Sequence, residues 1–125
     1  MNFKLANPPQ DHRSKAFWMQ HGAGFLVFEN IRKYAIEKID PKIDDNAKSL
    51  NVKGINDAIY GMMMQMDGVF DPLENDEFRL ELQTSILLFK NEEVVKAINT
   101  LDGDGMCMGY HDWMEDNFGE DKIIK

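Results

Sequence analysis

The longest regular pattern of apolar positions in the chain runs from Gly54 to Phe70. Apolar side chains recur there at intervals of three, four and seven residues, which places them on one face of an α-helix. This face comprises Ile55, Ala58, Ile59, Met62, Met63, Met66, Val69 and Phe70. The pattern predicts a central methionine-rich helix that ends at Asp67-Gly68, with the last two listed residues folding back on it. Tyr60 and Met64 form a weaker apolar edge, so we expect more than one neighbour.

A second helical pattern precedes it, from Lys15 to Ile39, with Ser14 as the predicted N-cap. Gly22 and Gly24 interrupt this helix, and each costs about 1 kcal/mol of helix stability relative to alanine. Such glycines are expected where another helix approaches closely or where the helix kinks. Asp40-Pro41 should end the helix, because the residue before a proline avoids the helical region.

The polar stretch between the two patterns, residues 41–53, is consistent with a loop or with a short helix that joins the central one at Gly54. Further along, residues 76–101 carry apolar side chains at helical spacing. These are Phe78, Leu82, Ile86, Phe89, Val94, Val95, Ile98 and Leu101. They predict either one helix of about 24 residues, which is long for a globular domain, or two helices that meet near Asn91, where a cap residue is followed by acids.

A last helix is predicted over Met106–Asn117, after an acidic glycine turn at residues 102–105. No convincing alternation of apolar and polar residues indicates a strand. The predicted fold class is therefore all-α: a single-domain helical bundle of about four to five helices with the methionine-rich helix at its centre. The domain spans residues 1–125, with an N-terminal arm over residues 1–13 and a frayed tail over residues 120–125.

Composition agrees with one globular domain. The chain has 125 residues, of which 43% are hydrophobic, so it can bury a core of its own. The single cysteine, Cys107, excludes an internal disulfide and favours a reducing, cytoplasmic environment. No apolar run approaches the roughly 20 residues that span a bilayer, so no membrane association is expected.

The net charge of −8 is unevenly distributed. Residues 1–38 carry six basic and three acidic side chains, a net of +3, so the remainder carries −11. This balance disfavours nucleic acid and anionic membranes as partners, since both would be repelled. It permits a basic protein partner or a cation, although a negative charge can also serve solubility alone.

The acidic end of the chain is the candidate partner-binding surface. It comprises Asp112, Glu115, Asp116, Glu120 and Asp121. As an alternative, His111 and Glu115 lie four residues apart and could face one metal ion, although a metal would need further ligands from elsewhere. The turn at residues 102–105 lacks calcium ligands at the required outer positions, which fall on Thr100 and His111.

Other residues with chemical potential are better explained by packing. His21 lies among aromatic residues and is expected to be a core histidine. Cys107 has acidic rather than basic neighbours in sequence, which argues against a reactive thiolate. The methionines are expected to fill the core or to form a partner or homodimer contact.

No nucleotide loop, nucleophile arrangement or complete metal-ligand set is recognisable, and no cofactor is predicted. The leading hypothesis is a non-catalytic interaction module, such as an immunity- or antitoxin-like protein that occludes a basic site on its partner. The alternative is a helical domain that binds a metal or a small ligand through His111 and Glu115. A homodimer is compatible with either.

Overall fold

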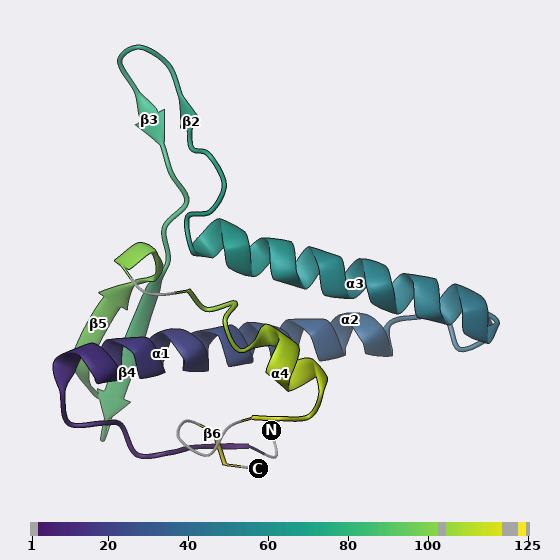
Figure 1. Cartoon of the computed structure of the whole chain (residues 1–125), viewed down its shortest axis with the longest axis horizontal. Coiled ribbons are helices and arrows are strands. Elements are labelled where there is room, and N and C mark those ends of the chain that lie inside the picture. Colours follow the sequence, from purple (N-terminus) through teal and green to yellow (C-terminus); the bar gives the residue numbers. More distant parts are fainter. Residues whose placement is uncertain (1–2, 103–104, 119–122, 125) are drawn as a thin grey trace.

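The computed structural model describes residues 3–102, 105–118 and 123–124. Within these ranges the fold is a mixture of α and β structure, in which two long helical segments run antiparallel and three two-stranded antiparallel sheets accompany them (Figure 1). The predicted all-α helical bundle is therefore wrong. The error lies in residues 76–101, which form strands where the sequence pattern predicted helices.

The first helical segment comprises α1 (His12–Leu26), a π-helical turn (Val27–Arg32) and α2 (Lys33–Glu37). It begins at Asp11 rather than at the predicted Ser14, because the Asp11 carboxylate accepts hydrogen bonds from the backbone N–H groups of Arg13 (3.1 Å) and Ser14 (3.0 Å). The segment ends before Asp40-Pro41, as predicted.

The central helix α3 spans Asp45–Met66 and starts at Asp44, whose carboxylate accepts from the Ala47 N–H at 2.7 Å. Gly54 lies inside this helix, so the prediction that it joins two helices is wrong. The C-terminus is as predicted, with Gly68 at a φ of +75°. The Val69 N–H donates to the Met64 carbonyl at 3.0 Å, so the backbone turns back at this end as predicted, although Val69 and Phe70 remain 61% and 45% exposed.

The hydrophobic core joins both helical segments to the residues around α4 (Tyr110–Met114). Its buried members are Phe25, Phe28, Ile59, Met63, Met106, Tyr110 and Trp113. Only the middle of the predicted apolar face of α3 is fully buried. The Trp113 ring packs edge-on against Phe25, with the centroids 5.8 Å apart, and this contact fixes the C-terminal part of the chain across the helices.

Four strands lie between α3 and α4. β2 (Leu73–Glu74) pairs with β3 (Arg79–Leu80), and β4 (Ser85–Lys90) pairs with β5 (Glu93–Asn99). Asn91 and Glu92 connect β4 to β5 with φ values of 49° and 69°, the left-handed conformation typical of a two-residue hairpin loop. The prediction that a helix begins at Asn91 is therefore wrong, since these residues form the turn.

The remaining elements are short. A 3₁₀ turn spans Thr100–Asp102, and α4 covers five residues where a helix over Met106–Asn117 was predicted. β1 (Lys4–Leu5) pairs antiparallel with β6 (Ile123–Ile124), so part of the expected tail is paired with part of the expected N-terminal arm. Phe3, in the N-terminal arm, packs on the core. Its ring centroid lies 4.9 Å from that of Phe25 and 4.8 Å from that of Phe118.

Candidate functional site

The acidic residues around α4 lie at the surface but do not share a helical face. Asp112 is exposed in the only full turn of α4, whereas Glu115 and Asp116 follow the end of the helix. The backbone turns there, because the Glu115 and Asn117 N–H groups both donate to the Asp112 carbonyl. Asp116 has a φ of 59°. Glu120 and Asp121 lie outside the described residues.

The two residues of the alternative metal site, His111 and Glu115, are separated by the same turn. Glu115 has φ −95° and ψ 16°, which is not helical, so its spacing from His111 no longer implies a common face. The imidazole of His111 lies beside aromatic rings, with centroids 5.8 Å from Tyr60 and 5.5 Å from Tyr110. Among the described residues, no group of three or more His, Cys, Asp or Glu side chains is arranged to hold a metal ion.

A partly buried polar cluster around Asp67 connects the middle of α1, the end of α3, Thr100 and the loop before α4. The Asp67 carboxylate accepts hydrogen bonds from the Gln20 amide (3.3 Å) and from the backbone N–H groups of Met106 (2.7 Å) and Cys107 (3.3 Å). Gln20, which is fully buried, also donates to the Thr100 carbonyl at 2.7 Å. The cluster therefore fixes the loop before α4 against α1 and the end of α3.

His21 and Cys107 have structural surroundings. The His21 ring is buried against Phe17, with centroids 4.4 Å apart, and edge-on to Trp113, in agreement with a core histidine. Burial, followed by the hydrogen bond and negative charge of Asp67, raises the pKa of the Cys107 thiol. A raised pKa lowers the thiolate fraction at neutral pH, so this cysteine is not an activated nucleophile.

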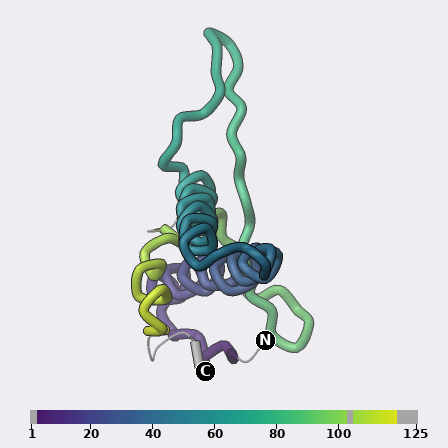
Figure 2. The backbone as a smooth tube through the Cα atoms, turned by 90° about the vertical axis from the view of Figure 1, so that its right-hand side faces the viewer, coloured from purple at the N-terminus to yellow at the C-terminus, as the bar shows by residue number. Residues whose placement is uncertain are grey.

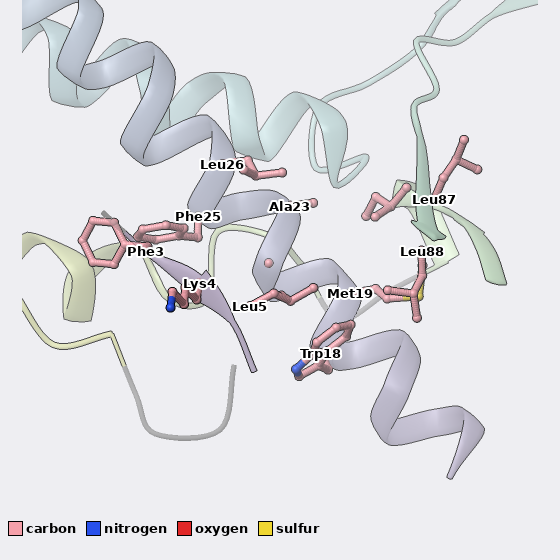
Figure 3. Close-up of a pocket in the computed structure, with 12 residues that line it drawn as sticks. Phe3, Lys4, Leu5, Trp18, Met19, Ala23, Phe25, Leu26, Leu87 and Leu88 are labelled. Atoms are coloured by element: carbon pink, nitrogen blue, oxygen red, sulfur yellow. The ribbon is translucent and has the colours of Figure 1, made fainter. Parts of the chain in front are cut away.

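An apolar groove of about 230 Å³ lies between β1, α1 and β4 (Figure 3). Leu5, Met19 and Leu88 come together there from the three elements, and Trp18 lies beside them. Among the described residues that line the groove, Lys4 alone has a titratable side chain. The described lining is therefore almost entirely apolar.

Among the described residues, the three most exposed large apolar residues, Leu73, Phe78 and Leu80, lie on a hairpin that projects from the end of α3 (Figures 1 and 2). We call residues 71–83, which contain β2 and β3, the β2–β3 arm. Its turn is well formed, because Asn75 Oδ1 accepts from the N–H groups of Glu77 (2.9 Å) and Phe78 (2.8 Å). Asn75 thus caps the hairpin turn.

The two faces of the arm differ in chemistry. Leu73 lies opposite Leu80 in the β2–β3 register, and Glu74 lies opposite Arg79. Directly opposite residues share a face, and alternate residues of one strand do too. Leu73 and Leu80 therefore share an apolar face and are 74% and 68% exposed, and Phe78 and Leu82, which flank β3, are 73% and 58% exposed. The other face is charged, and Arg79 forms an ion pair with Glu81 there.

The arm also carries a strong negative charge. It contains five carboxylates and one basic side chain, Arg79, which gives a net charge of −4. The carboxylates are Asp71, Glu74, Asp76, Glu77 and Glu81. A hollow of about 220 Å³ lies at the base of the arm, lined by Phe70, Arg79 and Leu101 among others. The arm is therefore an acidic ribbon whose apolar face has no cover within the described residues.

Sequence reasoning missed the arm as a functional candidate. The available signal was the strict alternation of apolar and charged residues over Phe78-Arg79-Leu80-Glu81-Leu82. This alternation has the period of a strand with one apolar and one polar face. The helical spacing of Phe78, Leu82 and Ile86 competed with it and led to the wrong prediction.

No protein-family model, curated protein or solved structure matches the chain at a significant level. Among the described residues, no helix has both the length and the apolar character needed to cross a membrane.

Proposed function

We propose that this protein is a non-catalytic interaction module that binds a basic protein partner through the β2–β3 arm. An immunity- or antitoxin-like inhibitor, which occludes a basic site on its target, is the specific role that this arrangement supports best. The main support for this proposal is the arm itself, a projecting acidic hairpin with an exposed apolar face.

The apolar face supports a protein partner rather than a small ligand. Four large apolar residues lie along the hairpin with exposed fractions of 58% to 74%, and Leu82 also lines the hollow at its base. Burial of each such side chain contributes about 1.5–3 kcal/mol, and an isolated two-stranded hairpin is at best marginally stable in water. A protein surface laid along the ribbon would provide this burial and would stabilise the hairpin.

Charge supports a basic partner. The net charge of −4 on the arm would attract a positively charged surface over about 10 Å at 0.1 M ionic strength. Such steering raises the association rate, and the increase is lost at high salt. The exposed acids Asp112 and Glu115 on and beside α4 are a second acidic site, and they would add to the steering if the partner reaches them.

A cytoplasmic location forms part of the proposal. Cys107 is a free thiol in the structure. An unpaired cysteine in a chain without disulfides suits a reducing compartment.

Substitutions on the arm test the proposal. The protein encoded by the adjacent gene is the first partner to assay, with binding to the purified chain measured at low and high salt. We expect Phe78→Ser combined with Leu80→Ser to weaken binding at least about 100-fold, because burial of two large side chains is lost. Glu74→Gln combined with Glu81→Gln should slow association about tenfold at low salt and little at high salt.

The matched control is Leu50→Ser on α3, which removes a side chain that is 65% exposed and distant from the arm. Binding of this variant should equal that of the wild type. Equal affinities for the arm variant and the control would reject the arm as the binding site. An effect confined to Asp112→Asn with Glu115→Gln would place the site at α4 instead.

A further inference from the structure

The register of the β2–β3 arm shows which backbone groups lie on its two outer edges. The Asn75 N–H donates to the Phe78 carbonyl at 2.9 Å, so this pair is hydrogen-bonded. Hydrogen-bonded and non-hydrogen-bonded pairs alternate along an antiparallel ladder. The next pair, Glu74 with Arg79, is therefore non-hydrogen-bonded, and its N–H and carbonyl groups point away from the partner strand to the two outer edges.

Neither edge has a neighbouring strand. Among the described residues, β2 and β3 form a two-stranded sheet, and the arm stands clear of the helices in both views (Figures 1 and 2). The outward N–H groups of Glu74 and Arg79 therefore have no strand beside them to which they could donate. An isolated pair of strands is marginally stable in water, and a third strand is one way to stabilise it.

Pro72 makes the two edges different. Continued by one residue from the pair of Leu73 and Leu80, the alternation sets Pro72 at the outer edge of β2 and Glu81 at the outer edge of β3. Proline has no N–H to donate, and at a strand edge it blocks pairing with a further strand. Glu81 has an N–H, so the edge of β3 is the one that can take another strand.

We propose that an extended segment of the basic partner, with basic and apolar residues alternating along it, adds as a third strand to the outer edge of β3. This inference rests on the proposed function, because it describes how the partner of the arm binds. The N–H and carbonyl groups of Arg79 would bond to the added strand. Recognition of this kind takes its affinity from main-chain hydrogen bonds and its specificity from alternate side chains.

The side chains of the arm determine the chemistry of the added strand. Neighbouring strands share their faces, so Leu80 favours an apolar residue beside it. On the charged face, Glu74 and Glu81 favour lysine or arginine. A second copy of the arm is disfavoured in this position, since each arm carries a net charge of −4 and the two edges would repel one another.

Nuclear magnetic resonance titration of the isotope-labelled full chain tests the proposal with a model peptide, acetyl-Lys-Val-Lys-Val-Lys-Val-Lys-amide. We expect saturable binding and a downfield shift of the Arg79 amide proton, which would enter a hydrogen bond, while the Glu74 amide proton stays in place. The control for charge alone is the block peptide acetyl-Lys-Lys-Val-Val-Val-Lys-Lys-amide. It should bind at least about tenfold more weakly, because its lysines and valines do not separate onto two faces of a strand.

Proline variants separate the two edges. Arg79→Pro removes the outward N–H of β3 and Glu74→Pro removes that of β2, while neither removes a hydrogen bond of the β2–β3 ladder. Arg79→Ala and Glu74→Ala control for the lost side chains, and the amide shifts of Leu73 and Leu80 show whether the ladder persists. We expect peptide binding to fall at least about tenfold from Arg79→Ala to Arg79→Pro, and to be equal for Glu74→Ala and Glu74→Pro.

The shifts of the wild-type chain test the proposal independently of the variants. Absence of saturable binding, an equal shift at Glu74 and Arg79, or equal affinity for the block peptide would overturn the proposal. So would equal binding by Arg79→Pro and Arg79→Ala with the ladder intact. Failure of the proposed function is a different result: the arm variants and the Leu50→Ser control would then bind the protein partner alike, whatever the peptide does.

Discussion

Replacing Asp67 with asparagine is expected to lower the free energy of unfolding by about 3 kcal/mol. Both carboxylate oxygens of Asp67 accept hydrogen bonds, from the Gln20 amide and the Met106 N–H on one oxygen and from the Cys107 N–H on the other. An asparagine side chain has one oxygen and one NH₂ group, so at least one of these donors would face another donor. The loss can be measured by urea unfolding followed by circular dichroism.

Asp57→Asn is the control for this prediction. Asp57 pairs with Lys53 at the surface of α3, with both side chains mostly exposed. Exposed pairs of this kind contribute little to stability, so we expect no measurable change. Equal unfolding midpoints for the two variants would show that the cluster around Asp67 does not hold the loop before α4 in place.

Alanine at Gly24 and alanine at Gly22 are expected to change stability in opposite directions. A Cβ atom at Gly24 would collide with the backbone carbonyl of Met106, whereas nothing lies within 4 Å of a Cβ at Gly22. Backbone cannot move aside as a flexible side chain can, so Gly24→Ala should cost about 2 kcal/mol or more. Gly22→Ala should stabilise the chain by about 0.5–1 kcal/mol, because alanine favours the helix.

Thermal and urea unfolding of the two glycine variants checks this prediction, and each variant serves as the other's control. The substitutions are identical and lie two residues apart in α1. If both variants were stabilised, the loop that contains Met106 would not pack on Gly24. The close approach of the Met106 carbonyl would then no longer explain why α1 has a glycine at position 24.

The sequence predicts the two long helical segments well because their apolar residues recur at helical spacing. In α3, the spacing of Ile55, Ile59, Met63 and Met66 has a single interpretation, and the Asp67-Gly68 end follows from the left-handed preference of glycine. The close approach expected of a glycine is confirmed at Gly24, although a loop rather than a helix approaches it.

The strands were missed because their pattern is ambiguous. Ile86-Leu87-Leu88-Phe89 is a continuous apolar run, which appears both in buried helices and in strands with two apolar faces. Asn91-Glu92 resembles a helix cap followed by an acid, but the same residues can form a hairpin turn. Local sequence does not decide between these structures, and tertiary packing against α1 does.

The arm was not singled out from the sequence for a related reason. Acid content alone pointed to the residues from Asp112 onwards, and the structure shows Asp112, Glu115 and Asp116 exposed but spread over a turn. The arm combines acids with an uncovered apolar face, and this combination becomes visible only when the register sets Leu73 opposite Leu80. Exposure of an apolar side chain is a property of the fold. The sequence could therefore indicate the strand, but it could not show that no other part of the described chain packs on its apolar side chains.

Site-specific photo-crosslinking in the cells that encode this protein tests the role of the arm most directly. A benzophenone amino acid replaces Phe78 on the arm in one variant and Leu50 on α3 in another. We predict that position 78 forms an adduct with one basic protein, that the adduct disappears when Leu80→Ser is added, and that position 50 does not form it. No adduct at position 78, or the same adducts at both positions, would contradict the assignment of the arm as the partner-binding site.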